Sequence, residues 1–582
     1  MKKSSLSARH VSLFLVPFII LLIAFSEHSQ VADAQPGPPR LFFSDIESGP
    51  NTGGQGNLGA FITLYGEGFG ATRGSSTITM GGQQVVNYVA WGENNAFARD
   101  LDMIVVQPGA AVTTGSILVT VNAQTSNPLP FAVRPGNIYF VATNGDDLNN
   151  GSFATPWRTV VNAKNSLAPG DIVYVMDGVV ETVEDMYGAA LSIETSGAPG
   201  APKAIIAYPG AVATIGSTAL EFGTRVPNNP DTLANDWVMA KLVLRGLIQA
   251  LDIGGSGSSR WRVVGNDISC PLGDGPVGCF AAALASHVAF LGNEVHDVSA
   301  QGPQPSKQYH AVYFTTDSNH IEVGWNHIHD NMTCRALQFH SSPLCVPDCG
   351  TSDTTGFNQY DLIVHDNLIH GDVCDGIVFA TVDPSKGPVR AYNNIIYDVG
   401  RGPSPPDGDA NYTGIYVAGG TNTGADGTGV VEIFNNTLYD CGRAQGVPSD
   451  NTDKGVLARG PGSPNLIMDL RDNLVYAVSG ETYFSPSSDT SLTTGTHNLW
   501  FGGGAAPDFL TGNISGDPLM VNVASGDFRL TANSPAVNGG VTTGAAWDYL
   551  GTGRPQGASF DIGAYEFVSS EPPGAPDIWL FH

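Results

Sequence analysis

Titratable side chains are concentrated between residues 307 and 375 of this 582-residue chain. Eight of the 13 histidines lie between positions 296 and 370, although only 14% of all residues are charged. An imidazole can exchange a proton near neutral pH, an arginine can neutralise an anionic substrate, and a carboxylate can orient either of them or bind a cation. Such a concentration indicates a functional site.

The polar residues of this region belong to five segments that share one pattern. Each begins with a lead residue, continues with Ala or Gly and then alternates apolar residues: HAVYFTT from His310, RALQFHS from Arg335, DGIVFAT from Asp375, TGIYVAG from Thr413 and KGVLARG from Lys454. Alternation with a period of two predicts strands with one inward face. Stacked strands would place the lead residues in a line, about 5 Å apart per step. The small residue after each lead predicts the floor of a groove.

Elimination from a uronic-acid glycan is one reaction that fits this line. It needs a cation to neutralise the substrate carboxylate and a base to remove the proton from the adjacent carbon. The sequence predicts Arg335 as the cation and His310 or Lys307 as the base. Tyr313 or His340 is then the acid that protonates the leaving oxygen.

Hydrolysis is the alternative reaction, and it needs two carboxylates on opposite sides of the bond. Asp330, Asp372 and Asp375 are the candidates, with Arg335 and His340 binding hydroxyl groups. Asp372 and Asp375 are also predicted to hold Ca²⁺ if the elimination uses a metal ion. A non-catalytic adhesin or glycan-binding protein is the third possibility.

Other polar residues of the same strands are expected to face outward and to bind the glycan. These predicted substrate-binding residues are Tyr313, Gln338, Tyr416 and Arg459.

The elements that would position these side chains repeat along the chain. A short apolar strand followed by an asparagine occurs seven times, with the asparagine at positions 266, 293, 326, 367, 394, 436 and 473. Separations of 27 to 42 residues are typical of a solenoid whose insertions form surface loops. An asparagine at one turn of every coil can bond its amide to the next, and this predicts a parallel β-helix with an internal asparagine ladder. The histidines at 327, 329, 365 and 370 are then explained equally well as solvent-facing turn residues.

The charge balance restricts the partners. Lys and Arg number 26 against 54 Asp and Glu, a formal net charge of -28. Such a surface repels polyphosphates, so nucleic acid is excluded as a partner. An acidic polysaccharide also requires a local basic cluster or bound Ca²⁺.

The first 34 residues predict a secretory signal peptide. Lys2, Lys3 and Arg9 precede an apolar stretch from Val11 to Phe25, and small residues end at Ala34. Export to the extracellular space or the cell surface is therefore expected, without a membrane span. Seven cysteines in an exported chain leave at least one unpaired, and the expected loop disulfides are Cys270 with Cys279 and, inside one long insertion, Cys345 with Cys349. Cys334 and Cys374 precede lead residues and are expected to stack on successive coils.

Residues 36 to 134 contain short alternating strands joined by Gly and Asn turns, which predicts a β-sandwich. The stretch SGPNTGGQGNLGAFITLYGEGFG, followed by ITMGGQQV and ILVTVNAQTSNPLPFAVR, resembles the IPT/TIG family of immunoglobulin-like domains. The resemblance implies an accessory module for spacing or binding.

Residues 137 to 567 open with IYFVATNGDDLNNGSFATPWRTVVNAKNSLAPGDIVYVMDGVV and close with DIGAYEF. Both segments resemble secreted right-handed β-helix proteins of the pectate-lyase-like superfamily, including family-nine pectate lyases. The resemblance implies an all-β fold, a right-handed parallel β-helix behind a small sandwich, and a polysaccharide partner. Family-nine lyases use a lysine base with calcium, and no lysine here matches that motif, so no catalytic role is carried over. An amphipathic helix over 157–167 is expected to close the first coil, and residues 568–582 are expected to form a tail.

Overall fold

The computed structural model describes residues 37–94, 101–228, 232–254, 257–302, 306–341, 359–405, 410–418, 427–444, 454–460, 462–478 and 480–569. The predicted signal peptide, the end of the tail and the insertion with Cys345 and Cys349 lie outside these residues. In the described residues strands dominate. The other regular elements there are one α-helix and three 3-10 turns: α1 (Val160–Ser166), η1 (Gln55–Asn57), η2 (Thr490–Leu492) and η3 (Val523–Ser525).

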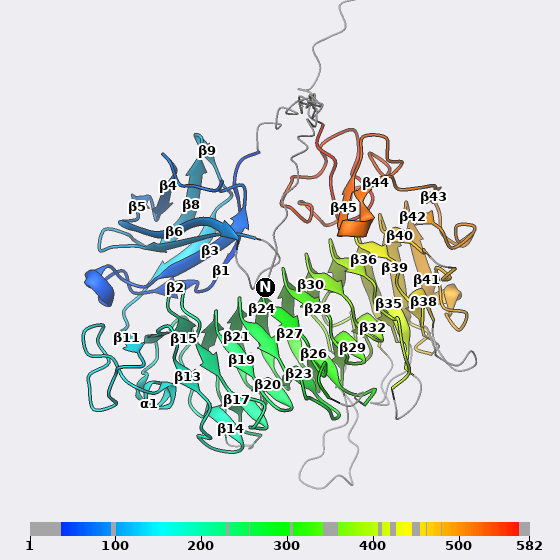
Figure 1. Cartoon of the computed structure of the whole chain (residues 1–582). Helices are drawn as coiled ribbons and strands as arrows, with labels where there is room; N and C mark the ends of the chain where they lie inside the picture. The colour runs from blue at the N-terminus through cyan, green and yellow to red at the C-terminus, as the bar shows by residue number, and fades with distance from the viewer. Residues whose placement is uncertain are drawn as a thin grey trace, which may run out of the picture. The chain divides into compact units, whose positions relative to one another are not determined.

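Three long parallel sheets form a β-helical rod, as predicted (Figure 1). Sheet 1 contains, in order, β11 (Ile138–Val141), β12 (Ile172–Val175), β15 (Lys203–Ala207), β18 (Trp237–Ala240), β21 (Ser259–Val264), β24 (Ser286–Leu291), β27 (Asn319–Gly324), β30 (Leu362–His365), β33 (Val389–Tyr392), β36 (Gly429–Phe434), β39 (Leu466–Arg471) and β41 (Thr493–Thr496). Sheet 2 contains β13 (Val180–Glu181), β16 (Thr214–Ile215), β19 (Val243–Arg245), β22 (Asp267–Ser269), β25 (Glu294–His296), β28 (His327–His329), β31 (Leu368–His370), β34 (Ile395–Tyr397), β37 (Thr437–Tyr439), β40 (Leu474–Tyr476), β42 (Leu499–Phe501) and β43 (Ile514–Ser515). Sheet 3 contains β14 (Ala189–Ser192), β17 (Phe222–Val226), β20 (Gln249–Ile253), β23 (Gly278–Ala283), β26 (His310–Thr315), β29 (Arg335–His340), β32 (Asp375–Phe379), β35 (Tyr412–Val417) and β38 (Lys454–Arg459).

The asparagine ladder forms at the corner between sheets 1 and 2. The side-chain oxygen of each ladder asparagine after Asn266 accepts hydrogen bonds from the backbone and side-chain amides of the asparagine one coil earlier, at 2.8–3.1 Å. Asn498 continues the ladder beyond the seven predicted members by accepting from Asn473. The residue before each asparagine adopts a left-handed backbone, so every one of these corners is two residues long. This constant corner sets the register of the coils.

The interior of the rod is apolar and closely packed. Phe280, Phe314, Phe339 and Phe379 stack on successive coils with ring centroids 5.3–5.5 Å apart. The small residues that follow the lead positions also face this interior: Ala311 and Ala336 belong to the core, and a Cβ on Gly376 would contact Ile396 and Val399. The predicted small-residue groove floor is therefore wrong, because these positions make room for core side chains of the neighbouring sheet.

Both ends of the rod are closed as the sequence suggests. Helix α1 starts after Thr159, whose hydroxyl accepts from the amide of Asn162, and it packs Val160 and Ala163 into the first coil. At the other end, residues 516–568 form the closing segment, with the hairpin β44 (Met520–Asn522) and β45 (Asp527–Leu530). Its buried ion pair joins Arg554 to Glu566 at 2.9 Å.

The described residues contain two disulfides. Cys270 bonds to Cys279, as expected, and Cys334 bonds to Cys374 on the next coil. Cys441 is buried and free.

The sandwich has two sheets. One contains β1 (Arg40–Ser44), β3 (Ile62–Glu67), β7 (Asp102–Gln107) and β6 (Asn87–Asn94). The other contains β2 (Ser48–Gly49), β10 (Leu129–Val133), β8 (Gly115–Val121), β4 (Thr77–Met80), β5 (Gln83–Gln84) and β9 (Gln124–Thr125).

The sandwich is docked on the outer face of sheet 1, and the two share a hydrophobic cluster. Phe61 packs edge-on against Tyr174 and accepts a hydrogen bond from its hydroxyl at 2.9 Å. Lys241 of the rod pairs with the buried Asp45 of the sandwich at 3.1 Å. This buried interface fixes the sandwich on the rod.

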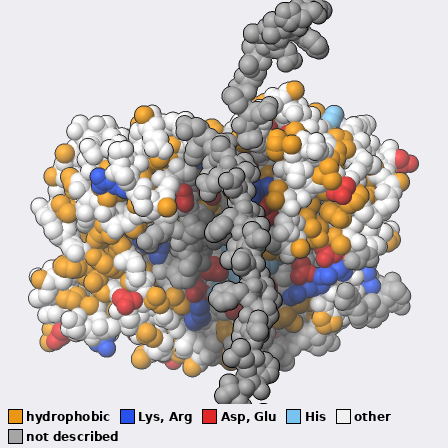
Figure 2. All heavy atoms as spheres, turned by 45° about the horizontal axis from the view of Figure 1, so that its top comes forward, with side chains coloured by type: hydrophobic (Ala, Val, Ile, Leu, Met, Phe, Trp, Pro, Cys, Tyr) orange, Lys and Arg blue, Asp and Glu red, His pale blue; other side chains and the backbone are white. Residues whose placement is uncertain are grey.

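None of the described helices is long and apolar enough to cross a bilayer. On the face shown in Figure 2, the described Lys and Arg side chains occur in small groups beside acidic ones.

Candidate functional site

A cavity of about 280 Å³ lies on the outer face of sheet 3, at β26 and β29. Register pairing places His310 beside Arg335, Tyr313 beside Gln338 and Thr315 beside His340. The cavity is lined by Pro276, Lys307, Gln308, His310, Tyr313, Arg335, Gln338 and His340. The structure thus brings together four of the five predicted catalytic residues and two of the four predicted substrate-binding residues.

Arg335 is held firmly at the wall of this cavity. Its Nη1 donates to the carbonyl of Lys307 at 2.7 Å, and its Nε lies 3.3 Å from the Asp375 carboxylate. Asp375 is fully buried, and its other oxygen accepts from the backbone amide and hydroxyl of Thr413 at 3.0 and 2.8 Å. Asp375 therefore orients Arg335 from behind instead of lining the cavity.

The two imidazoles of the cavity are neutral near pH 7. Burial, followed by the charge of Arg335, lowers the pKa of His310 well below its usual value. The same two causes lower the pKa of His340 to about 4. The Tyr313 hydroxyl lies 3.1 Å from Nδ1 of His340, and its ring packs edge-on against His310.

Among the described residues, Nδ1 of His310 and Oε1 of Gln338 are buried polar atoms of this cavity without a hydrogen-bond partner, and Nε of Arg335 has only its ion pair with Asp375. Leaving such atoms unsatisfied costs about 1–3 kcal/mol each. Unsatisfied groups at a cavity wall suit a polar ligand.

The remaining predicted residues lie elsewhere. Tyr416 belongs to the same outward column as Tyr313 and Gln338, two coils beyond Gln338, where it packs with Val378 and Ala458. Arg459 was expected to face outward, and this is wrong. It pairs with Val417, continues the inward phenylalanine column, and donates to the carbonyls of Gly460, Gly462, Ser463 and Leu466.

The surroundings of Asp372 and Asp375 do not favour the predicted Ca²⁺ site. Both carboxyl groups are fully buried, and neither lines the cavity. Burial raises the pKa of Asp372 well above its usual range, which favours the neutral acid, whereas Ca²⁺ prefers ionised carboxylates. Asp375 already has its partners in Arg335 and Thr413.

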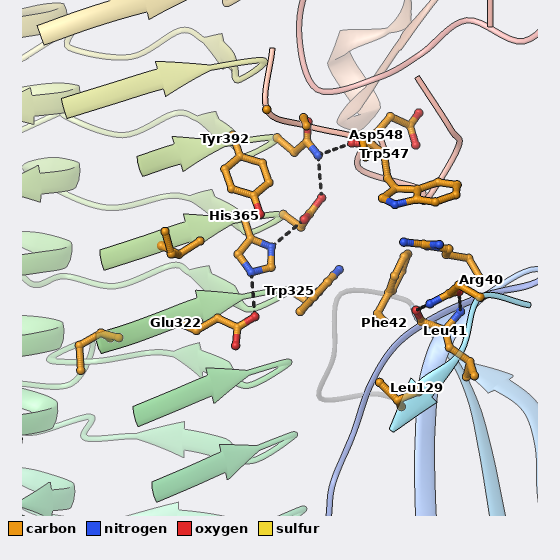
Figure 3. Close-up of a pocket in the computed structure, with 18 of the residues that line it drawn as sticks. Arg40, Leu41, Phe42, Leu129, Glu322, Trp325, His365, Tyr392, Trp547 and Asp548 are labelled. Atoms are coloured by element: carbon orange, nitrogen blue, oxygen red, sulfur yellow. Dashed lines mark hydrogen bonds and ion pairs between the residues drawn. The ribbon is translucent and has the colours of Figure 1, made fainter. Parts of the chain in front are cut away.

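A larger cavity, of about 710 Å³, is a cleft between the sandwich, sheet 1 and the closing segment (Figure 3). Arg40 and Phe42 come from the sandwich, Trp325 and Tyr392 from the rod, and Trp547 from the closing segment. The guanidinium of Arg40 lies over the Trp547 ring, 3.4 Å from its centroid. A further cavity, of about 510 Å³, adjoins this cleft along sheet 1. The two share His287, His320 and Glu322.

A chain of charged groups crosses the wall of the cleft. His365 lies between Glu322, 3.2 Å from its Nε2, and Asp366, 2.8 Å from its Nδ1 (Figure 3). Burial alone would lower the pKa of His365, but the two hydrogen-bonded carboxylates outweigh it and raise the pKa to about 9. The cleft therefore combines flat aromatic surfaces with fixed polar groups.

Trp325 stands out in the cleft because of its backbone. It occupies the left-handed corner position before Asn326, with a φ of 56°. Equivalent corners carry Gly265, Gly292, Asp366 and Asn393, residue types that tolerate this conformation. A tryptophan there is strained, and strain retained at a cavity wall points to a function.

Sequence reasoning missed the cleft because its walls come from three distant segments. Its only local signal was the bulky Trp325 in a turn position where the other copies carry small or polar residues.

Comparisons with known proteins identify the sandwich by its family. The IPT/TIG domain family matches residues 42–133, so the sandwich is an IPT/TIG domain. No curated protein matches the chain. Similar solved structures include pectate lyase Pel9A, with 14% identity over 74% of this chain and 96% of that one and a TM-score of 0.46. A rhamnogalacturonan lyase shares 14% identity over 62% and 87%, with a TM-score of 0.37. A GH136 lacto-N-biosidase from Eubacterium ramulus shares 13% over 65% of each chain, with a TM-score of 0.36. No residue role follows from these likenesses.

Proposed function

We propose that the protein is an exported lyase that cleaves a uronic-acid-containing glycan by β-elimination in the sheet 3 cavity. The observation that carries the proposal is the convergence of Arg335, two neutral imidazoles and a tyrosine hydroxyl on one small cavity. A guanidinium fits the planar carboxylate of a uronate. The basic wall of the cavity also supplies the local positive charge that an acidic chain needs to bind an acidic glycan.

Each group has a place in the reaction. Arg335 and Gln338 bind the substrate carboxylate, which makes the adjacent C–H bond more acidic. His310 removes this proton, and the electron pair forms the C4–C5 double bond as the C4–O bond breaks. Tyr313, hydrogen-bonded to His340, protonates the leaving oxygen. The bound carboxylate offsets the charge of Arg335 and thereby raises both imidazole pKa values toward the working pH.

Hydrolysis is the weaker alternative at this site. It needs two carboxylates facing the bond, and the described residues that line the cavity include none.

The test is incubation of the mature protein with a panel of uronic and neutral polysaccharides. Ultraviolet absorbance of unsaturated uronate ends and a reducing-sugar assay are read in parallel. We expect unsaturated product from a uronic glycan; reducing ends without unsaturation would contradict the proposal in favour of hydrolysis.

Variants locate the reaction in the cavity. We expect His310→Ala and Gln338→Val to lower kcat/KM by roughly 100-fold, the usual scale for losing an acid–base or charge-stabilising group. Valine matches the residue of the next coil in the same column, so Gln338→Val is compatible with the fold. His497→Asn, which lines neither this cavity nor the cleft, is the matched control. Full turnover in both site variants would reject the assignment.

The cleft supports a second function, non-catalytic glycan binding. Aromatic faces beside hydrogen-bonding carboxylates are suited to the apolar faces and hydroxyl groups of sugars. We expect Trp547→Ala to weaken retention of the protein on an immobilised glycan at least tenfold and to leave turnover of short soluble oligosaccharides unchanged. Affinity electrophoresis measures the retention; equal mobility of variant and wild type would contradict this function.

A further inference from the structure

An outward column of aromatic side chains runs along sheet 2. Register pairing aligns His296, His329, His370, Tyr397, Tyr439, Tyr476 and Phe501 on successive coils. The closing segment packs Phe528 against Tyr397 and Tyr439. The histidine end of the column lies beyond these contacts.

Three imidazoles converge at this end. His327 and His329 are two residues apart on β28 and so face the same side, with ring centroids 3.9 Å apart. His370 of β31 pairs with His329 in register, and its Nε2 lies 2.9 Å from Nε2 of His327. One nitrogen from each of the three rings lies within 4.8 Å of the others, and all three residues are half-buried.

This spacing suits a metal ion. Nitrogen ligands 2.0–2.1 Å from a tetrahedral zinc ion are roughly 3.3 Å apart. A set of three imidazole nitrogens favours Zn²⁺, Cu²⁺ or Ni²⁺ over Ca²⁺, which prefers oxygen ligands.

Neighbouring carboxylates complete the arrangement. Asp330 lies 3.0 Å from Nδ1 of His329, the usual position for a carboxylate that orients a metal-binding imidazole. Glu294 lies 3.2 Å from Nε2 of the same ring, the nitrogen left for the metal ion, so a bound ion would replace this hydrogen bond. Both charges favour a cation at this place.

We propose that His327, His329 and His370 bind one divalent transition-metal ion, with Zn²⁺ as the representative, and that this ion links the coils of β28 and β31. The site lies on sheet 2, whereas the proposed reaction takes place on sheet 3, so the two proposals are independent. The ladder asparagines Asn326 and Asn367 immediately precede the two strands and fix their register.

The test uses the full mature chain without a histidine tag, after dialysis against a chelator. Zn²⁺ is titrated by calorimetry, and Co²⁺ by visible absorption, which reports tetrahedral nitrogen ligation. We expect one ion per chain, micromolar or tighter affinity, and a higher Tm with Zn²⁺ but not with Ca²⁺.

His370→Ala and His327→Gln are each expected to weaken Zn²⁺ binding at least 100-fold and to abolish the zinc-dependent rise in Tm. His327→Gln keeps a side chain of similar size, so it tests the site if His370→Ala destabilises the coil. His497→Asn, which changes a histidine outside the cluster and outside both cavities, is expected to bind Zn²⁺ like wild type. Absence of saturable binding, or unchanged affinity in His370→Ala and His327→Gln, would overturn the proposal.

Discussion

At the scale of single residues, burial decides what each polar group of the sheet 3 cavity can do. The positive charge of Arg335 faces the Asp375 carboxylate and the Lys307 carbonyl. His310 and His340 lose theirs because burial and the same arginine disfavour a second positive charge. The charge of Arg335 is thus available to bind an anionic substrate and also keeps His310 and His340 neutral.

Asp375 is predicted to be a positioning residue. Asp375→Asn keeps the shape of the side chain but removes the charge that holds Arg335, so we expect kcat/KM on the uronic glycan to fall about tenfold, or about 1.4 kcal/mol. The loss should appear mainly in KM, because binding of the substrate carboxylate is affected first. Asp375→Glu keeps the charge but moves the carboxylate, so it should not restore kcat/KM.

Asp372→Asn is the control for this prediction. Asp372 is equally buried and its raised pKa already favours the neutral form, so the amide changes little. A similar loss in both variants would show a general effect of the coil and not a role for Asp375 in holding Arg335.

At the scale of the elements, the two-residue corners are the strongest structural signal in the chain. Each corner contributes an asparagine whose amide bonds both to its neighbour in the ladder and to a backbone carbonyl one coil earlier. These bonds are buried, so each removed amide leaves several polar groups without partners.

Asn367→Ala is therefore expected to lower the free energy of unfolding by about 2–5 kcal/mol. The substitution removes the acceptor of the backbone and side-chain amides of Asn326, and it removes the donor to the buried oxygens of Val323 and Asn394. Urea denaturation followed by circular dichroism measures this change. Asn465→Ala, an exposed turn asparagine outside the ladder, should change stability by less than about 0.5 kcal/mol. Equal stabilities of the two variants would contradict the structural role of the ladder.

The sequence predicted the rod well because its pattern is local and repeated. Asn498 escaped notice because its strand, Thr493–Thr496, contains threonine and glycine instead of alternating apolar residues. Arg459 was misplaced because Lys454 was aligned with Thr413, whereas in the structure Lys454 pairs with Tyr412 and Gly455 with Thr413. A slip of one residue moves every side chain of a strand to the opposite face.

The sheet 3 cavity was predictable in part for the same reason. His310, Arg335 and His340 occupy repeated positions whose register follows from the pattern. The inward orientation of the small residues was not predictable, because it depends on how much space the neighbouring sheet fills at each coil.

At the scale of the whole body from residue 37 to residue 568, the sandwich and the closing segment stand on the same side of the rod (Figure 1). Phe42 and Phe43 of the sandwich pack against Trp325, with ring centroids 5.4 and 5.0 Å away. Such contacts join residues about 280 positions apart, which no local pattern reveals.

Export remains a prediction. The mass of the secreted chain would check cleavage after Ala34.

The charged group His365 couples the stability of this body to pH. Its pKa is raised in the folded state to about 9, so its stabilising contribution is complete below the unfolded value of about 6.5 and is lost as pH rises through 9. We expect the free energy of unfolding to fall by on the order of 3 kcal/mol between pH 6 and pH 10 from this group alone.

Urea denaturation at several pH values, with His365→Gln as the comparison, isolates this contribution. The variant should be less stable than wild type at pH 6 and should approach it above pH 9. A constant difference between the two proteins across this range would contradict the charged state of His365.

The constant two-residue corner also limits how such a chain can change in length. Duplication of one complete coil would add a single rung, lengthening the rod by about 4.8 Å while every face keeps its orientation. One extra amino acid inside the corner would instead rotate the following strand out of phase with its neighbours. New coils can therefore be added by duplication of whole units. The outward-facing side chains of each added coil can then change without disturbing the register of the rod.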